Sequence, residues 1–354
     1  MEHKIKLFPS SWLYNAGVIG FLRVLAYGMG EEKIENWLKD DGTVEVDSKS
    51  FEKDREKSQA LDSYYKFHDS KPPIVGNSIY RNFINPSRKA QDEASFIEFV
   101  SALYTLRESE ESKSCSICGR KFNLNCELSE EAKKFLETRQ RFDIYHGYYI
   151  APTSKLPNSF WNLNTSFYLC PLCVYLLIHH HIPFIKTQHG GIFINAPSFK
   201  IMWYLNKLAK EFLQRGKEFT LREILGTSLM ELTQRIYLTL GVWSLMQIEM
   251  VITKTKNTEV AYYSLPFNTA RILLNRNVAN LVSATQEPYI LQCVLNEDFE
   301  ALLFLSHCIL GVLQGRKDQS LEGKIKNQNR SHLSTLAQIL PTLYVKINSL
   351  IKGA

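Results

Sequence analysis

The hydrophobic positions near the start of the chain predict one buried helix. In "SSWLYNAGVIGFLRVLAYG" the larger apolar residues recur at helical spacing among small ones: Leu13, Ile19, Leu22 and Leu25. Ser10 or Ser11 is suited to the N-cap, and Gly28 or Gly30 to the position that ends the helix. We therefore expect a helix between these two boundaries.

The next hundred residues change character twice. Residues 40–90 are rich in charge, Pro, Asn and Ser without a sustained period, so we expect loops with short strands. In "EASFIEFVSALYTLR" the apolar residues return to one helical face: Phe96, Phe99, Val100, Leu103 and Leu106. The polar end of this predicted helix leads directly into the first pair of cysteines.

From residue 198 onward the pattern is mainly helical. Thr220 and Glu223 have the spacing of a capping box at the start of a helix. The segment 245–266 reads as two strands around a Lys-Asn turn, and three further helical segments close the chain. We expect a mixed α+β protein in three parts. These are an α+β region at 1–110, a zinc-knuckle subdomain at 111–197 with a long insertion, and a mainly helical region at 198–354 that contains the hairpin.

Composition limits the classes of protein that fit. The 354 residues are 45% hydrophobic, enough for a substantial core, and the net charge of +6 permits a polyanionic partner without requiring one. The N-terminus lacks the pattern of a signal peptide, and no window has the roughly 18 uninterrupted apolar residues of a membrane span. We expect a cytoplasmic protein with no membrane contact, where a disulfide framework is a poor use for seven cysteines.

Two CxxC pairs carry the clearest chemical signal. Cys115 and Cys118 form the first pair, and Cys170 and Cys173 form the second. Two intervening residues let both sulfurs of a pair reach one ion, and two such knuckles complete a tetrahedral four-sulfur site that suits Zn²⁺. A redox dithiol is the alternative, but "SCSICGRKF" lacks the thioredoxin-like strand and helix that such chemistry needs. A chain that binds no metal is the third possibility.

The distance between the pairs has a structural consequence. Zinc ribbons usually separate their pairs by about 15–20 residues, whereas residues 119–169 lie between these two. The metal is therefore expected to hold together a subdomain whose insertion is rich in Tyr, Phe, Trp and Asn. Four cysteines leave no need for His179, His180 or His181 as ligands, and the remaining cysteines are expected in the core: Cys126, Cys293 and Cys308.

The opening "IKLFPSSWLYNAGVIGFLRVL", together with the two CxxC pairs, resembles the CXXC-CXXC family of CRISPR-associated proteins, the large subunits of type I-B Cascade complexes. The first motif combines seven residues in one short run: Trp12, Tyr14, Asn15, Gly17, Gly20, Phe21 and Arg23. The resemblance covers roughly the first 200 residues. Family members are usually longer and end in a helical bundle. That bundle either acts together with the small subunit or is produced as a separate protein, the small subunit itself. This chain departs from the family pattern in its C-terminal part, where the bundle is expected to be shortened or missing.

The resemblance implies a binding role without catalysis. Such a subunit contacts the 5′ end of the guide RNA and recognises a short motif that flanks the target in double-stranded DNA. The implied partners are guide RNA, target DNA, the backbone, guide-end and small subunits of Cascade, and the helicase-nuclease. The chain has no GxxxxGK[ST], HExxH or GxSxG motif, which agrees with a protein that is not an enzyme. A free-standing zinc-dependent nucleic-acid binding protein and a purely structural assembly protein remain alternatives.

Two groups of residues are the candidates for nucleic-acid contact. Asn15 and Arg23 lie eight positions apart, so they can share a helix face and hold the guide's 5′ end. The segment "GNSIYRNFINPSRKA" and the insertion between the knuckles are expected to meet the target duplex. Arg and Lys can neutralise phosphates there, and Asn can read base edges. The candidates in the segment are Asn77, Arg81, Asn82, Arg88 and Lys89.

Overall fold

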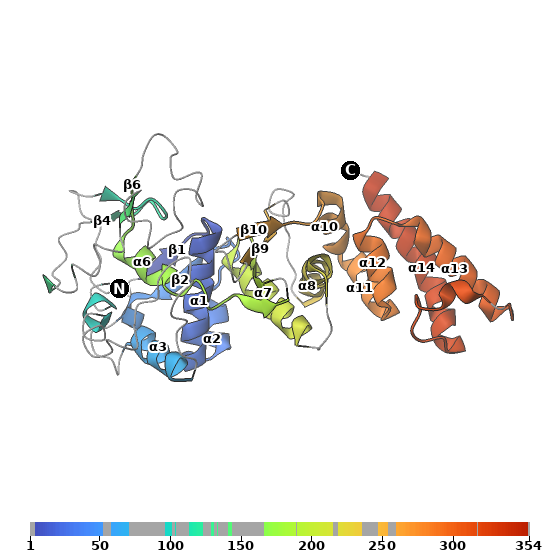
Figure 1. The fold of residues 1–354 in the computed structure, drawn as a ribbon, viewed down its shortest axis with the longest axis horizontal. Coiled ribbons are helices and arrows are strands. Elements are labelled where there is room, and N and C mark those ends of the chain that lie inside the picture. Colours follow the sequence, from blue (N-terminus) through green and yellow to red (C-terminus); the bar gives the residue numbers. More distant parts are fainter. Residues whose placement is uncertain are drawn as a thin grey trace. The chain divides into compact units, whose positions relative to one another are not determined.

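The computed structural model has a mixed α+β fold in which a four-cysteine cluster lies within the N-terminal half and the C-terminal region is helical (Figure 1). It describes residues 4–51, 58–70, 96–100, 103, 113–122, 129–130, 133, 141–143, 166–188, 190–214, 219–235, 247–253, 260–316 and 318–352. The chain divides into two compact units. The first comprises Met1–Trp203 and Met250–Tyr262, and the second comprises Tyr204–Glu249 and Tyr263–Ala354.

The first unit begins with a two-stranded antiparallel sheet whose strands lie before and after the first two helices in the sequence. Strand β1 (Lys4–Leu7) pairs with β2 (Val44–Asp47), and the helices α1 (Trp12–Met29) and α2 (Glu31–Trp37) lie between them in the sequence. Ser11 is the N-cap of α1, and Gly30 ends it with a φ of 90°. Both boundaries of the predicted first helix are therefore confirmed.

A helix replaces part of the predicted loop region. After a 3₁₀ turn (Ser48–Phe51), α3 (Gln59–Ser70) packs against α1, so the prediction of loops and short strands is wrong for this segment. Leu61, Tyr64 and Phe67 have helical spacing and are buried. The charged and polar residues between them obscure this helical spacing in the sequence. Farther along, Phe96, Phe99, Val100 and Leu103 are buried, as predicted for one face.

Two short antiparallel strand pairs and a larger sheet complete the first unit. Strand β3 (Lys113–Ser114) pairs with β4 (Lys121–Phe122), and β5 (Arg141–Asp143) pairs with β6 (Ser166–Tyr168), which leads into α6 (Pro171–Leu177). The larger sheet has the order β10-β9-β8-β7. Its strands are β7 (Ile185–Thr187), β8 (Gly190–Asn195), β9 (Glu249–Thr253) and β10 (Val260–Tyr263). The two strands expected near 245–266 are present as β9 and β10, and β9 is hydrogen-bonded to β8.

The second unit consists of helices among its described residues. They are α8 (Leu221–Arg235), α10 (Phe267–Leu273), α11 (Arg276–Thr285), α12 (Pro288–Leu295), α13 (Glu300–Leu313), a 3₁₀ turn (Gln319–Leu321) and α14 (Arg330–Lys352), and α7 (Phe199–Leu213) spans the division between the units. The predicted capping box is confirmed at α8. The backbone N of Thr220 donates to Glu223 Oε2 at 2.9 Å, and the backbone N of Glu223 donates to Thr220 Oγ1 at 3.2 Å.

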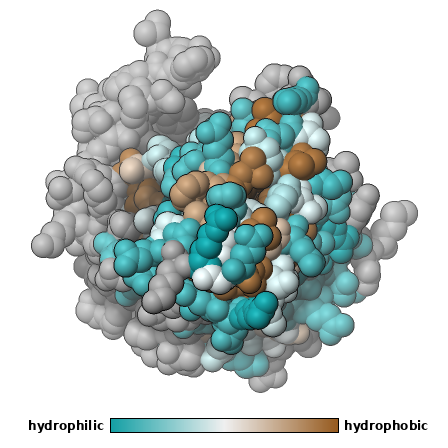
Figure 2. Space-filling view, turned by 90° about the vertical axis from the view of Figure 1, so that its right-hand side faces the viewer, coloured by the Kyte–Doolittle hydropathy of each residue, from teal (hydrophilic) through white to brown (hydrophobic). Residues whose placement is uncertain are grey.

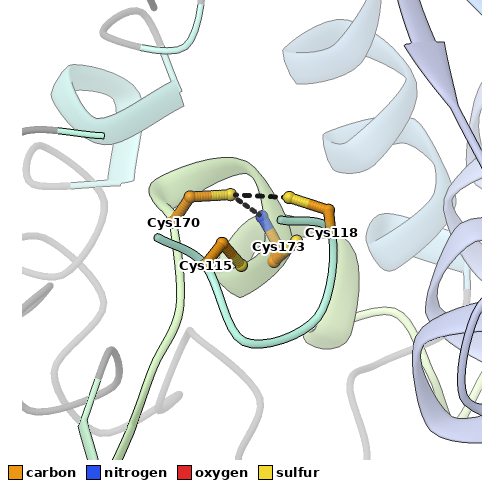
Figure 3. Close-up of side chains that lie close together, drawn as sticks. All are labelled: Cys115, Cys118, Cys170 and Cys173. Atoms are coloured by element: carbon orange, nitrogen blue, oxygen red, sulfur yellow. Dashed lines mark hydrogen bonds between the residues drawn. The ribbon is translucent and has the colours of Figure 1, made fainter. Parts of the chain in front are cut away.

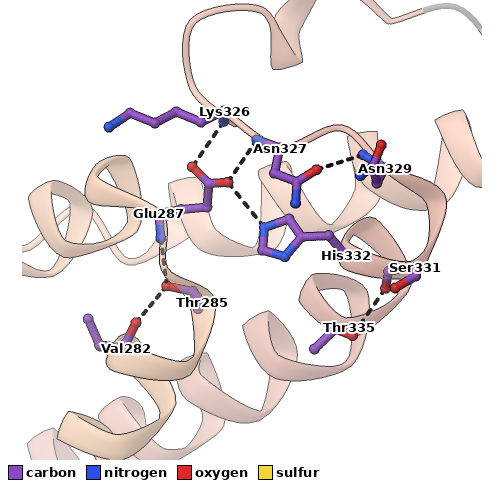
Figure 4. A network of polar contacts seen from close by, with 9 residues as sticks. All are labelled: Val282, Thr285, Glu287, Lys326, Asn327, Asn329, Ser331, His332 and Thr335. Atoms are coloured by element: carbon purple, nitrogen blue, oxygen red, sulfur yellow. Dashed lines mark hydrogen bonds and ion pairs between the residues drawn. The ribbon is translucent and has the colours of Figure 1, made fainter.

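A buried carboxylate fixes the loop before α14 (Figure 4). Glu287, only 4% exposed, accepts hydrogen bonds from the backbone N of Lys326 at 3.0 Å and of Asn327 at 3.2 Å, and its Oε1 lies 3.1 Å from His332 Nε2. A buried carboxylate needs such partners because desolvation without them is costly. These bonds hold the loop between α13 and α14 in place, and its Leu321 and Ile325 are buried.

Apolar side chains also reach the surface of the second unit. Exposed members on α13 and α14 are Leu303, Phe304, Leu310, Val345 and Ile351. Figure 2, which views the molecule from the side of these helices, has brown apolar side chains among teal polar ones. Of the helices in the described residues, none is long and apolar enough to cross a membrane.

Candidate metal centre

The four cysteines of the two CxxC pairs converge on one point (Figure 3). Their sulfurs all lie within 4.8 Å of one another, and Cys118 Sγ is 3.7 Å from Cys170 Sγ. A disulfide would bring two sulfurs to about 2.05 Å. A tetrahedral zinc ion with Zn–S bonds of about 2.3 Å separates its sulfurs by about 3.8 Å. The cluster could therefore hold a metal ion, and its geometry is compatible with zinc.

The first knuckle is the turn between β3 and β4. The backbone N of Cys115 donates to Arg120 O at 2.9 Å, and the backbone N of Gly119 donates to Cys115 O at 2.9 Å. Gly119 has a φ of +70°, a conformation that a residue with a side chain adopts at a cost. This turn directs Cys115 and Cys118 toward the same point.

The second knuckle is the start of a helix. Cys170 is the N-cap of α6, Pro171 occupies the first turn, and the backbone N of Cys173 donates to Cys170 Sγ at 3.4 Å. Pro is favoured in this position because it has no N–H to leave unsatisfied. A donor aimed at the sulfur favours its ionised form, which is the form that binds metal.

Hydrogen bonds tie the first knuckle to the strand that leads into the second. The backbone N of Ser116 donates to Tyr168 O at 2.8 Å, and the backbone N of Tyr168 donates to Ser116 Oγ at 3.2 Å. Tyr168 belongs to β6, so the strand that returns from the insertion docks on the first knuckle before it reaches Cys170. A third contact comes from the turn after β1, where Ser10 Oγ donates to Ile117 O at 3.3 Å.

The protonation of the cluster explains why it suits a cation. Hydrogen bonds from Cys118, Cys170 and Cys173 lower the pKa of Cys115. Donation to Cys115, with burial adding to it, raises the pKa of the Cys170 and Cys173 thiols well above the usual value. The first thiolate therefore opposes formation of the next ones. Four thiolates can coexist only when a positive ion offsets their mutual repulsion.

Helix α1 packs directly on the helix that carries the second knuckle. A Cβ on Gly17 would lie 2.7 Å from Leu176 O, and a Cβ on Gly20 would lie 2.1 Å from His179 O. The rings of Phe21 and Tyr175 meet edge to face at 5.5 Å. The glycines of the opening motif thus let α1 approach the backbone of α6 and of the turn after it, a role that the sequence alone did not indicate.

Asn15 and Arg23 both contact the chain that follows α6. Asn15, 1% exposed, donates to Ser10 O and to Asn195 Oδ1, each at 2.9 Å, and accepts from the backbone N of Ser10 at 2.8 Å. Arg23 is half-buried and donates to Pro183 O at 3.3 Å. Burial lowers its pKa to about 10, so it remains charged at neutral pH. Both have structural contacts, and guide binding by either stays a prediction.

The predicted duplex-contact residues Asn77, Arg81, Asn82, Arg88 and Lys89 lie outside the described residues, as does most of the insertion between the knuckles. Within the described part, the group that could hold a metal ion consists of the four cysteines, without His179, His180 or His181. Sequence reasoning missed Ser116 and Tyr168, whose contacts depend on pairing between distant segments. Comparisons with family models, with curated proteins and with solved structures give no match to this chain.

Proposed function

We propose that this chain is a non-catalytic, zinc-stabilised nucleic-acid binding protein that acts as the large subunit of a type I-B Cascade complex in the cytoplasm. Its role is to contact the 5′ end of the guide RNA and to recognise the motif that flanks the target in double-stranded DNA. Its partners are the backbone, guide-end and small subunits and, for target destruction, the helicase-nuclease.

The packing of α1 on α6 is the observation that carries the proposal. The resemblance rests on two features that are far apart in the sequence, the opening motif and the CxxC pairs. Gly17 and Gly20 of the motif meet the backbone at Leu176 and His179, just beyond Cys173. The opening motif and the proposed metal centre are therefore packed against each other, which supports reading them as two parts of one family signature.

Charges on the first knuckle support contact with a polyanion. Arg120 and Lys121 follow Cys118, and within the described chain neither side chain has a hydrogen bond or an ion pair. Other lysines nearby are neutralised, since Lys6 pairs with Asp41 at 2.8 Å. Unpaired cations beside an exposed turn are suited to phosphates. Zinc is the proposed metal because four sulfurs with tetrahedral spacing suit it.

Copurification tests the assignment. The tagged chain is produced with a CRISPR array and the genes that neighbour its own, and the purified material is analysed for RNA. We expect guide RNA of uniform length together with the other subunits. The Cys115→Ala, Cys170→Ala double variant should lose zinc and the complex, whereas Cys293→Ala should keep both.

The alternatives give different results in the same experiment. A free-standing nucleic-acid binding protein would bring down RNA or DNA of mixed length without partner subunits. A structural assembly protein would bring down protein partners without nucleic acid. Either outcome would refute the Cascade assignment.

A further inference from the structure

A hollow of about 350 Å³ lies between the first knuckle and the turn after β1. Its walls are residues 6–10 and 117–120, and Tyr14, Leu172 and Cys173 complete the lining. The volume is at the lower end of the range for small-molecule sites, about 300–1,000 Å³. The bond from Ser10 Oγ to Ile117 O joins the two walls.

The lining combines an exposed aromatic ring with an unused hydroxyl. Phe8 is 60% exposed, and Lys6 Nζ lies 5.5 Å from the centre of its ring. Tyr14 has a hydroxyl that makes no hydrogen bond within the described residues. An exposed ring beside a cavity offers a stacking surface for a flat group, and the hydroxyl can bond to its edge.

The charge of the metal centre decides which part of a nucleotide fits inside. Cys118 and Cys173 line the hollow, and four thiolates around one dication leave a net negative charge. A phosphate is therefore disfavoured there, whereas a neutral nucleobase is not. Arg120 is at the rim and Lys121 follows it, both without a partner in the part of the chain that is described, so phosphates are favoured outside.

We propose that this hollow binds one unpaired nucleobase of a single-stranded nucleic acid, stacked on Phe8, with the adjoining phosphates on Arg120 and Lys121. The inference rests on the proposed nucleic-acid function and assigns it a site. A base in a duplex is stacked and paired on both sides, so it cannot enter. Selection for single strands follows from the shape of the site.

Binding of labelled RNA to the purified, zinc-loaded chain tests the site. The probes are a short single-stranded RNA and the same sequence as a duplex, measured by fluorescence anisotropy at several salt concentrations. Phe8→Ala should weaken single-strand binding about tenfold, leave its salt dependence unchanged and leave duplex binding unaffected. Phe8→Tyr should bind as the unchanged protein does, because it keeps the ring.

The charged rim and the controls give separate readouts. Arg120→Gln with Lys121→Gln should flatten the salt dependence for single strands, since phosphate contacts release counterions. Tyr262→Ala removes another exposed aromatic ring from the first unit and should change nothing. Zinc content and thermal unfolding confirm that each variant is folded.

Several results would overturn the site. The first is a Phe8→Ala variant that binds RNA as tightly as the unchanged chain, and the second is an equal loss of affinity for single strands and duplexes. The third is displacement of the RNA by adenosine monophosphate at concentrations similar to those of the RNA, which would indicate a free nucleotide as the ligand. If guide RNA still copurifies with the assembled complex in those cases, the proposed function stands and only this site fails. Phe8-dependent binding without a copurifying guide would support the site in a free-standing protein.

Discussion

At the scale of single residues, the candidate metal centre brings together four sulfur atoms that would repel one another as thiolates without a bound cation. Metal binding and folding are coupled when the site exists only in the folded chain. The same four residues are recognisable in the sequence because each pair is local. Their meeting across residues 119–169 could be inferred only from the chemistry of a four-sulfur site.

We expect one zinc ion per chain, measured by elemental analysis of protein purified without added metal. The Cys115→Ala, Cys170→Ala double variant should bind none, and its free energy of unfolding should fall by more than about 3 kcal/mol. Cys293→Ala is the matched control, because Cys293 is buried away from the cluster. Full stability of the double variant in denaturant titrations would contradict a structural metal.

Other residues could not be assigned from the sequence. Asn15 was predicted to contact the guide, but its amide is engaged by Ser10 and Asn195. The contact with Asn195 joins residues 180 positions apart, and no local pattern reveals it. The Thr220 and Glu223 capping box, in contrast, was predictable because it lies within one helical turn.

At the scale of elements, the contact between α1 and α6 depends on two positions without side chains. Helix α1 was predictable from its apolar residues and its flanking Ser and Gly. The reason for Gly17 and Gly20 was not, because the nearby backbone belongs to α6 and the turn after it, about 160 residues later. For α3, the spacing of Leu61, Tyr64 and Phe67 was a usable signal that charged neighbours obscured.

Replacing a glycine by alanine changes stability in two ways, through helix propensity and through packing, and two positions distinguish these effects. Gly20→Ala should lower the free energy of unfolding by about 3 kcal/mol or more, because its Cβ would meet a backbone carbonyl that cannot move easily. Gly311→Ala in α13 has only a side-chain atom at 3.7 Å nearby and should raise stability by about 0.5–1 kcal/mol. Urea unfolding measures both, and similar effects for the two would argue against the close approach.

At the scale of the whole molecule, a run of three histidines, of which His179 and His180 are buried and His181 is half-buried, ties stability to pH. Burial lowers the pKa of His179 to about 3, of His180 to about 4 and of His181 to about 3. In the unfolded chain they take up protons near pH 6.5. Between about pH 6.5 and 4 the unfolded state therefore binds more protons, and stability falls as the pH falls.

We expect His179→Asn to flatten this dependence by about 1.4 kcal/mol per pH unit, the amount due to one proton. Asn can keep the hydrogen bond that His179 Nδ1 makes to Tyr175 O at 2.8 Å. The measurement is urea unfolding at several pH values in that range. The comparison uses slopes, so a loss of core packing alone does not affect it. An unchanged slope would mean that His179 is not the group that titrates.

The pairing of distant segments was the least predictable part of the fold. The chain pattern indicated strands near 245–266, but not that β9 would lie beside β8, or that β1 would pair with β2 around two helices. Strand pairing depends on side chains that meet only after the chain folds, and period-2 patterns in strands of four to six residues do not specify a partner.

The packing of α1 on α6 also sets an order of events on the ribosome. Helix α1 leaves the ribosome long before α6, which covers part of its apolar surface in the folded chain. At about 5–20 residues per second, α6 follows about 8–30 s later. During that interval the part of α1 that α6 will cover stays exposed, so a chaperone that binds apolar nascent segments is expected to hold it. The second cysteine pair emerges with the start of α6, because Cys170 is the N-cap and Cys173 lies in the first turn, so binding of the proposed zinc ion would coincide with the moment at which α1 can dock on α6.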